Sequence, residues 1–527
     1  MSRILRELEA LQGREGWLPE AGLGEIAARL GVPLHRLEGL SSFYTHFRRE
    51  PPPAVEIVVC RDVTCRLAGA TAAQADLRAS LEEAGVVLRE VSCLGRCDRA
   101  PAGCVGHRPV DLRDEAEVRA ALGDPEPAQR PPRNWAADPF PTAAERHVAL
   151  RALLARDPQA LSAQLEESGL RGMGGAGFPT GRKWALVAAE SARPKHIVCN
   201  ADESEPGTFK DREILHDLPH LVIEGMLLAA HCVGASRGTV FIRHEYEAER
   251  RRLEWALNAA REEGLLGSGV LGTSLDFDIE IFVSPGGYIL GEETALLECL
   301  EDRRGEPRNK PPFPGQRGLY GLPTLINNVE TFAHAVGILS RGVDWWRSLG
   351  RGDFSGHKFM AVSGDVESPG VYLVPFGMTL RELLEEAGGM RGGEECLAVS
   401  PGGASSLFLG AERLDAALDF DAIEEAGSML GSGAACFVAR GRNLLEVGLD
   451  VTRFFRNESC GKCVPCRVGS EKAVRWFEER PCTPALTAEL RDLHHTLERT
   501  SICGLGQVAL APLLSILERF PDSVSGE

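Results

Sequence analysis

Apolar residues recur along the chain with two spacings, one of about 3.6 residues and one of two, and these predict alternating helices and strands. Leu23, Ile26, Ala27 and Leu30 have the helical spacing, and a Gly-Val-Pro triplet ends that helix. Residues 1–50 are therefore predicted to form a small helical unit. A run of three prolines follows it and marks a boundary.

Residues 54–122 are predicted to form a compact α/β layer. The apolar run VEIVVC indicates a strand, an alanine-rich helix through Leu77 and Leu81 follows, and a second strand lies around Val86–Val91 before a closing helix near 114–122. This β-α-β-α order brings the loops after both strands to one end of the layer.

The middle of the chain is predicted to be a linker followed by the largest domain. Residues 123–142 contain six prolines and little periodicity, which is typical of a semi-rigid linker. From 143 to 335, strand signals at His196–Cys199 and Thr239–Ile242 alternate with helices, and residues 277–283 alternate apolar and charged positions. We expect an α/β domain here.

Two smaller domains are predicted at the C-terminal end. Residues 355–440 carry short strands around the helix TLRELLEEAGG, which is the size of a small β-grasp (ubiquitin-like) module. Residues 441–527 are predicted to be helical. The fold class is therefore α/β multidomain, with helical units at both ends.

Composition and charge exclude several classes of protein. With 43% apolar and 25% charged residues the chain is an ordinary globular protein, and its formal charge of −18 argues against nucleic acid as a partner. The N-terminus is charged and lacks a signal peptide, and the longest apolar run, 221–242, is interrupted by Glu224, His231 and Arg237. We expect a cytoplasmic protein with no membrane insertion.

Four of the 15 cysteines have the spacing of an electron-transfer site. Cys460, Cys463 and Cys466 form C-x2-C-x2-C, and Cys503 follows further along the chain. Three thiolates at this interval can hold three corners of a [4Fe–4S] cluster while a distant one closes the fourth. A structural zinc site usually has paired knuckles or a Cys/His mixture, so zinc and inert thiols are the weaker alternatives.

A second set, Cys60-x4-Cys65 and Cys93-x3-Cys97, follows the two strands of the N-terminal α/β layer. A [2Fe–2S] rhomb needs two thiolates on each iron, and two loops that each offer a pair can supply them. Zinc is the alternative here, because paired cysteines also suit zinc.

A glycine-rich loop lies at the start of the largest domain. Gly172, Gly174 and Gly177 match G-x-G-x-x-G, but the preceding segment is polar and helical and not the buried strand of a dinucleotide-binding turn. Four glycines within six residues still let backbone N–H groups approach a flat ring or a phosphate, and Lys183 adds a positive charge. The alternative is a flexible surface loop, although Phe178 would stiffen it.

Three later segments add polar and aromatic candidates. Residues 200–213 crowd acids into a loop at the carboxyl end of a strand, where ligands of open α/β sheets gather, although such loops are often only solvated. Residues 286–298 open a helix whose N–H groups favour a phosphate. Residues 308–331 contain Phe313, which can stack on a base, and an asparagine pair that could equally cap a helix.

Together these motifs resemble the flavin-bearing, NADH-oxidising subunit of respiratory complex I. The same family includes the diaphorase subunits of NAD-reducing hydrogenases and of NAD-dependent formate dehydrogenases. The likeness covers residues 143–527 and rests on RGMGGAGFPTG, NADESEPGTFKDR, GEETAL, INNVET and ESCGKCVPCR. Residues 1–122 resemble the family's thioredoxin-like two-iron subunit through GWLPE, SSFYTHF and four cysteines, so the chain resembles a fusion of the two.

The resemblance implies four cofactors, namely FMN, NAD, a [4Fe–4S] and a [2Fe–2S] cluster, the first cluster carried by the C-terminal helical bundle. The residues implied to hold FMN are Gly172, Gly174, Gly175, Lys183, Asn200, Asp202, Tyr288, Gly291, Glu292, Asn327 and Asn328. The residues implied to contact NAD(H) or to complete the cofactor site are Phe178, Glu203, Ser204, Glu205, Glu293, Lys310 and Phe313. Glu205 and Glu293 are expected to act as electrostatic and orienting groups.

The implied reaction follows from what each centre can carry. NADH gives up a hydride, an iron–sulfur cluster takes one electron, and a flavin can do both. Met173 stands where complex I usually has arginine and is more like the formate-dehydrogenase branch, whereas ESEPG is more like complex I. We therefore expect the β-subunit of a cytoplasmic NAD-dependent formate dehydrogenase, partnered by a separate molybdenum-containing catalytic chain.

Three alternatives remain open from the sequence. The chain could serve complex I or an NAD-reducing hydrogenase. It could be a non-catalytic electron-relay scaffold, or a zinc-stapled binding module without redox function.

Overall fold

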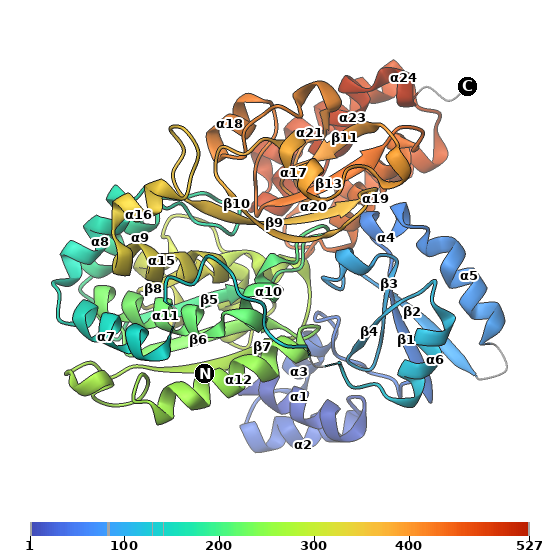
Figure 1. The fold of residues 1–527 in the computed structure, drawn as a ribbon. Coiled ribbons are helices and arrows are strands. Elements are labelled where there is room, and N and C mark those ends of the chain that lie inside the picture. The colour runs from blue at the N-terminus through green and yellow to red at the C-terminus, as the bar shows by residue number, and fades with distance from the viewer. Residues whose placement is uncertain (1–2, 82–84, 129, 141, 525–527) are drawn as a thin grey trace.

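The computed structural model describes residues 3–81, 85–128, 130–140 and 142–524. A helical N-terminal unit, a thioredoxin-like domain, a large α/β domain, a β-grasp domain and a C-terminal helical domain follow one another along the chain (Figure 1). Within the described ranges, no helix is both long enough and apolar enough to cross a lipid bilayer.

The N-terminal unit is attached to the large domain through the first helix. Its helices are α1 (Ile4–Glu15), α2 (Glu20–Leu30) and α3 (Leu34–Ser41). The carboxylate of Asp302 accepts hydrogen bonds from the N–H groups of Arg3, Ile4 and Leu5 at 2.7–3.1 Å. First-turn N–H groups have no partner inside their own helix, so a residue almost 300 positions away supplies the cap.

The thioredoxin-like domain contains the predicted strands and helices together with a hairpin that the sequence pattern missed. Its elements are β1 (Val55–Cys60), α4 (Val63–Leu67), α5 (Ala70–Ser80), β2 (Val86–Val91), β3 (Ala102–Val105), β4 (Arg108–Asp111) and α6 (Glu115–Gly123). The strand order is β2-β1-β3-β4, with β1 parallel to β2 and the other pairs antiparallel. The hairpin strands have only four residues each, too few for a clear alternation.

The large domain is built on a four-stranded parallel sheet. Its strands are β5 (His196–Ala201), β6 (Arg237–Arg243), β7 (Asp278–Ser284) and β8 (Thr324–Asn328), in the order β7-β6-β5-β8. Its helices are α7 (Ala143–Leu154), α8 (Pro158–Glu167), α9 (Thr180–Ala189), α10 (Lys210–Asp217), α11 (Pro219–Val233), α12 (Glu247–Glu262), α13 (Glu293–Leu300), α14 (Pro314–Arg317), α15 (Val329–Arg341) and α16 (Val343–Ser348). The predicted strands are confirmed, and the expected domain limit at 335 falls inside α15.

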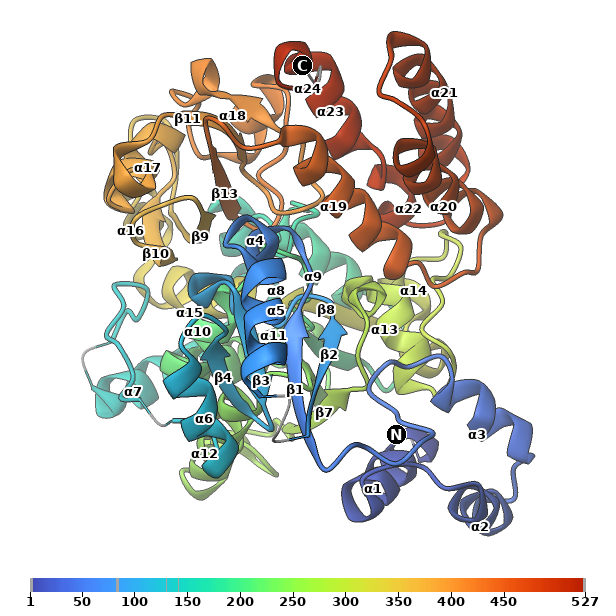
Figure 2. The same cartoon turned by 90° about the vertical axis from the view of Figure 1, so that its right-hand side faces the viewer.

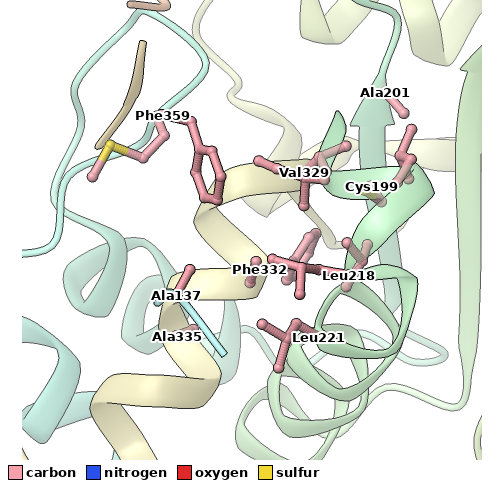
Figure 3. Close-up of a cluster of buried hydrophobic side chains, with 14 of the residues drawn as sticks. Ala137, Cys199, Ala201, Leu218, Leu221, Val329, Phe332, Ala335 and Phe359 are labelled. Atoms are coloured by element: carbon pink, nitrogen blue, oxygen red, sulfur yellow. The ribbon is translucent and has the colours of Figure 1, made fainter. Parts of the chain in front are cut away.

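The core of this domain also takes side chains from its neighbours. Leu218 and Leu221 lie at α11, Val329 and Phe332 belong to α15, and Phe359 approaches from the β-grasp domain (Figure 3). Side chains from three segments distant in sequence thus share one core.

The segment expected to be a linker packs onto the large domain. Ala137 joins the same core, and the indole Nε1 of Trp135 donates to Asp217 at 2.8 Å. Arg130 pairs with the same carboxylate at 2.8 Å. Fixed contacts along this segment therefore hold the thioredoxin-like domain near the large one.

The β-grasp domain and the C-terminal helical domain lie above the parallel sheet of the large domain in Figure 1. In Figure 2 the helices α20 and α21 of the helical domain are at the upper right. The β-grasp domain comprises β9 (His357–Gly364), β10 (Gly370–Pro375), α17 (Leu380–Glu386), β11 (Cys396–Ser400), β12 (Leu409–Gly410), α18 (Phe420–Glu425) and β13 (Ala434–Ala439), with strand order β10-β9-β13-β11-β12. The helical domain comprises α19 (Leu444–Asn457), α20 (Val464–Glu479), α21 (Pro484–Thr500), α22 (Gly504–Val508), α23 (Ala511–Arg519) and α24 (Pro521–Val524).

Candidate functional site

The predicted site residues gather at the carboxyl edge of the parallel sheet. Asn200 is the penultimate residue of β5 and pairs in register with Asn328, which ends β8. The amide of Asn200 donates to the carbonyl of Gly291 at 2.8 Å, and this contact brings the segment before α13 to the same edge. Asn327 lies inside this group, because its side-chain oxygen accepts from Trp184 at 3.0 Å.

The glycine-rich loop forms a tight backbone cradle beside these asparagines. The N–H of Gly172 donates to the carbonyl of Phe178 at 2.9 Å and closes the loop. A Cβ at Gly174 would lie 3.0 Å from Cβ of Asn328, and Gly175 has φ of +114°, which strains any other residue. The loop therefore keeps its bare backbone against the sheet edge, where a flat ring or a phosphate could approach.

A buried ionic cluster anchors the loop to the β-grasp domain. Glu330 accepts from Lys210 at 2.8 Å and from Lys358 at 3.0 Å, and Lys358 reaches the carbonyl of Met173 at 3.4 Å. Burial raises the pKa of Glu330, but the two lysines together hold it well below its usual range. Met173 itself is 1% exposed, so the residue that departs from the complex I pattern faces the interior.

In the acidic loop after β5, Asp202 has a carboxylate oxygen that accepts no hydrogen bond from the described residues. Burial raises the pKa of Asp202 to about 7, although Arg243 lowers it. Ser204 donates to one carboxylate oxygen at 3.3 Å, while the other is buried and has no hydrogen-bond partner among the residues that the structure describes. A buried carboxylate oxygen is normally hydrogen-bonded, so this atom fits a ligand N–H or O–H.

Glu203 has a different environment from the one expected. Its carboxylate accepts from the backbone N–H groups of Asp211 at 2.9 Å and Arg212 at 3.2 Å, and from the hydroxyl of Tyr246 at 2.9 Å. It therefore caps the first turn of α10. Both oxygens of this carboxylate therefore already accept hydrogen bonds from the protein.

Glu205 lies between two domains. It accepts from the N–H of Ser405, in a β-grasp loop, at 2.7 Å, and burial raises its pKa to about 7. Burial and then the negative charges of Glu205 and Cys503 raise the pKa of Tyr288. The ring of Tyr288 packs 5.0 Å from that of Phe454 in α19. One carboxylate and one phenol thus link the acidic loop to the C-terminal cysteine site.

The start of α13 is not the open phosphate site that the sequence predicts. The side chain of Glu292 accepts from the N–H groups of Thr294 and Ala295, both at 2.9 Å. A carboxylate from the chain itself therefore takes the place expected for a phosphate. The correction follows from the position of Glu292 as the N-cap, where a side-chain oxygen can reach the first turn.

Two lysines surround the neighbouring carboxylate. Lys310 lies 3.0 Å from Glu293 and 2.9 Å from Glu292, and Lys183 lies 3.6 Å from Glu293. Burial raises the pKa of Glu293, but Lys183 and Lys310 together lower it by more than burial raises it. The net pKa is therefore below its usual value, and this group stays ionised at neutral pH. The arrangement offers ammonium groups to an anion and a carboxylate to a donor.

Two aromatic rings of the predicted site face solvent. Phe178 is 43% exposed and Phe313 is 55% exposed, which is unusual for large apolar side chains. Exposed ring faces of this kind can stack on a planar base or nicotinamide. Within the described chain the structure records no ring contact between them.

The N-terminal cysteine set forms one buried group. The Sγ atoms of Cys93 and Cys97 are 3.6 Å apart, and hydrogen bonds with Cys65 and Cys93 raise the pKa of Cys60. All four are at most 3% exposed. The N–H of Gly207 donates to Cys97 at 3.4 Å, so the acidic loop of the large domain touches this group.

The C-terminal cysteine set lies at helix starts. Cys463 precedes α20, Cys466 lies in its first turn, Cys503 precedes α22, and Cys460 lies in the loop before them. Ser459 lies 3.3 Å from the sulfur of Cys466. Within the described ranges, no three Cys, His, Asp or Glu side chains have the spacing that holds a single metal ion. The thiolate-rich donor sets themselves fit iron–sulfur clusters.

Sequence reasoning missed a carboxylate that connects these regions. Glu458 accepts from the N–H of Tyr288 at 2.7 Å and from the hydroxyl of Ser92, the residue before Cys93. It stands at the start of the motif ESCGKCVPCR, two residues before Cys460. Its presence in the motif was visible, but its contacts with two other domains were not.

Four family models match successive parts of the chain. They are the thioredoxin-like [2Fe–2S] ferredoxin over residues 1–125, the Nuo51 FMN-binding domain over 165–336, the SLBB domain over 359–398 and the NADH-ubiquinone oxidoreductase-F iron–sulfur binding region over 446–526. These matches establish FMN-binding, [2Fe–2S] and [4Fe–4S] domains in one chain.

Known relatives agree with this assignment. The F 2 subunit of the NADH-quinone oxidoreductase of Rhizobium meliloti is 43% identical over 367 residues, which are 69% of this chain and 87% of the relative. The HndC subunit of the NADP-reducing hydrogenase of Solidesulfovibrio fructosivorans is 39% identical over 72% of this chain and 80% of its own length.

A solved structure, an NAD⁺-reducing [NiFe]-hydrogenase in the H₂-reduced state, matches with a TM-score of 0.86 and 31% identity. The match covers 98% of this chain and 92% of that one, so the entire multidomain arrangement has a known counterpart. The chain therefore belongs to the family of the flavin-bearing F subunits of NADH-quinone oxidoreductase, which are NAD-dependent flavin and iron–sulfur oxidoreductases.

Proposed function

We propose that this chain is a diaphorase subunit in which NAD(H) and FMN exchange a hydride and two iron–sulfur clusters carry single electrons. The observation that supports this most is the position of the cradle, at a sheet edge whose acidic loop contacts the N-terminal cysteine set and whose Tyr288 is affected by the charge of Cys503. The acidic loop reaches Cys97 through Gly207, and Tyr288 lies near Cys503. FMN bound there supplies the exchange between two-electron and one-electron chemistry.

The chain's own residues are proposed to hold the flavin by backbone and amide contacts. The bare backbone of Gly174 and Gly175 admits a flat ring or a phosphate, and the unpartnered oxygen of Asp202 accepts a ligand N–H or O–H. The remaining residues proposed for FMN are Gly172, Lys183, Asn200, Tyr288, Gly291, Glu292, Asn327 and Asn328. Their backbone and side-chain hydrogen bonds keep them oriented before the ligand arrives, which lowers the entropic cost of productive binding.

NAD(H) is proposed to bind over the exposed aromatic rings. Phe178 and Phe313 stack on its rings, Lys310 faces its phosphates, and Ser204 completes the site. Glu293, held ionised by two lysines, orients donors of the ligand. Glu205, with its pKa raised to about 7, is protonated in part at neutral pH and can donate or accept a hydrogen bond. Both act by positioning.

For the partner we propose a molybdenum-containing formate dehydrogenase chain, on the likeness of Met173 to that branch. An NAD-reducing hydrogenase is the second candidate, and the match to a solved hydrogenase over 98% of this chain favours it. We propose a cytoplasmic, multisubunit complex with no nucleic-acid partner. Isolating the native complex and assaying NAD⁺ reduction with formate and with hydrogen separates the two candidates.

NADH-dependent ferricyanide reduction tests the reaction itself. A preparation purified without air and loaded with FMN is expected to reduce ferricyanide and to bleach on addition of NADH. A flavin-loaded preparation without activity would contradict the proposal and favour the relay-scaffold alternative.

A further inference from the structure

A cleft of about 950 Å³ lies between the thioredoxin-like domain, the segment before α7, and α12. Eight arginines and four carboxylates line it, although the whole chain has a formal charge of −18. Neither the flavin pocket nor either cysteine set uses this cleft. Its excess of arginine on an acidic protein is the feature to explain.

The charges in the cleft are layered, with arginines outside. The side chains of Arg130 and Arg133 are 38% and 49% exposed, whereas their partners Glu213 and Asp217 are 7% and 0% exposed. Buried carboxylates orient these guanidinium groups while part of each still faces solvent. Because the carboxylates are buried below the guanidinium groups, the part of the cleft that a partner would contact is positively charged.

Two exposed carboxylates at the rim limit this positive field. Glu126, 57% exposed, pairs with Arg251 at 2.6 Å, and Asp124, 70% exposed, lies 3.7 Å from Arg108. They lie outside the lining of the cleft, as does Glu247, which also pairs with Arg251 at 2.7 Å. Because the lining arginines other than Arg252 pair with carboxylates, the positive surface depends on guanidinium groups that lie further out than their partners.

α12 adds an exposed aromatic residue next to an arginine without a carboxylate. Trp255 is 61% exposed, and the guanidinium of Arg252 lies 4.7 Å from its ring centre. Arg252 also donates to the carbonyl of His216 at 3.4 Å, and within the described part of the chain it pairs with no carboxylate. Tryptophan and arginine are the residues most enriched among the energetic centres of protein interfaces.

The cleft begins at the [2Fe–2S] cysteine loop. Arg96, Asp98 and Arg99 line it, and they flank Cys97 on both sides in sequence. Cys97 is 3% exposed, so a protein seated in the cleft would approach the cluster without touching its ligand.

We propose that this cleft docks an acidic one-electron carrier protein beside the [2Fe–2S] cluster. The arginine layer attracts the acidic face, and Trp255 with Arg252 forms the anchor. A reduced carrier docked there loses one electron as the oxidised cluster gains it, and no bond is made or broken. The inference rests on the [2Fe–2S] assignment but not on the hydride step of the proposed function.

The probe for the test is an acidic [2Fe–2S] ferredoxin, and its binding to the anaerobically purified, FMN-loaded chain is measured by calorimetry at low and high salt. Arg252→Glu and Trp255→Ala are each expected to weaken binding about tenfold. Arg475→Glu, on the exposed face of α20, reverses a charge far from the cleft in sequence and is the matched control, expected to change binding less than about twofold. Added salt is expected to weaken binding to the parent chain.

The NADH–ferricyanide rate separates failure of this docking site from failure of the proposed function. All three variants should retain that rate, because none touches the flavin pocket. Ferredoxin that does not bind at low salt, or that binds both cleft variants as tightly as the parent, would overturn the proposal. Equal weakening by the α20 control would overturn it too, as would displacement of ferredoxin by micromolar pyrophosphate, which would make the cleft a small-anion site.

Discussion

The two cysteine sites of this chain differ in depth and in what holds them. The four cysteines of the N-terminal set are 1–3% exposed, whereas in the C-terminal set only Cys466, at 5%, is buried and the other three are partly exposed. Arg243 donates to the carbonyl of Cys93 at 2.5 Å, and Gly207 donates to Cys97, so the buried set is enclosed by contacts between domains. The exposed set lies at helix starts of a single domain.

This difference indicates that the two clusters depend on different parts of the fold. The buried [2Fe–2S] site needs the thioredoxin-like domain to stay docked. The four cysteines of the [4Fe–4S] site all come from the helical domain, although Lys462, which lies between two of them, donates to the carbonyl of Pro307 in the large domain at 2.7 Å. The exposed apolar residues Val464 and Val468, 60% and 51% exposed, follow Cys463 in helix α20. Cluster potentials respond to solvent exposure and hydrogen bonds, so the two sites are expected to differ electronically as well.

The largest effect is expected from removing one ligand of the C-terminal cysteine set. Cys466→Ser should abolish the four-iron cluster and about two thirds of the bound iron, while the [2Fe–2S] signal persists, because the two sites share no ligand. Electron paramagnetic resonance and iron analysis measure this. Cys482→Ser, outside both sets, is the control and should keep both signals. Loss of both clusters in the Cys466 variant would show that the sites are coupled.

Next in size is the loss of the arginine that joins the domains. Arg243 is 2% exposed and donates to backbone carbonyls of Cys93 and Glu203. Arg243→Ala should lower the free energy of unfolding by about 3–5 kcal/mol, because it breaks the ion pair with Glu245 at 2.8 Å and leaves two buried carbonyls without donors. Hydrogen exchange should quicken at residues 93–97 but not in the C-terminal domain. Arg237→Ala, at the exposed start of the same strand, is the control. If amide exchange at residues 93–97 were equally slow in both variants, Arg243 would not be what holds the thioredoxin-like domain against the large domain.

A pH-dependent effect is expected at Glu205, the carboxylate beside the buried set. Its pKa is raised from 4.5 to about 7, so the folded chain holds this proton where the unfolded chain has lost it. The contribution of Glu205 to stability therefore falls as pH rises from about 4.5 to about 7 and is unfavourable above that.

Glu205→Gln should consequently raise the free energy of unfolding by about 2 kcal/mol at pH 8 and by less at pH 5.5. Denaturant unfolding at the two pH values measures the difference. Glu293→Gln, at a carboxylate whose pKa is lowered, should not stabilise at pH 8 and serves as the control. A gain of equal size at both pH values would show that the buried proton is not the cause.

The smallest effect is expected at Glu458, which connects the two cysteine regions. Glu458→Ala should cost about 1–2 kcal/mol of unfolding free energy through the lost bonds to Ser92 and Tyr288. A double-mutant cycle with Ser92→Ala isolates the contact between domains. Glu471→Ala, on an exposed face of α20, is the control, and a coupling energy near zero would remove Glu458 from the link between the sites.

Sequence patterns predicted the parts of the fold that rest on local periodicity. The alternation at residues 277–283 and the apolar run before Asn200 predicted two of the strands that the parallel sheet contains. Asn328 was assigned to the flavin site only through the family resemblance, because the residues alone fitted a helix cap equally well. The hairpin beginning at Ala102 was missed because its strands are short. The local motifs therefore identified the glycine-rich loop and the strands beside it, but not the hairpin or the contacts between domains.

The unpredicted parts depend on contacts between distant segments. Ser405 reaches Glu205 from another domain, and Lys358 reaches the glycine-rich loop across 185 residues. Glu203 was expected to face the ligand, but the position of α10 makes it a helix cap. A residue's type shows what it can bind, whereas its partner depends on how the domains pack, and a single sequence does not contain that information directly.

The cap on α1 has a consequence for biosynthesis. Arg3, Ile4 and Leu5 are translated almost 300 residues before Asp302, which accepts from their N–H groups. At 5–20 residues per second this interval is roughly 15–60 s. During it the nascent helix α1 lacks its final acceptor, so a segment translated early is locked in place late.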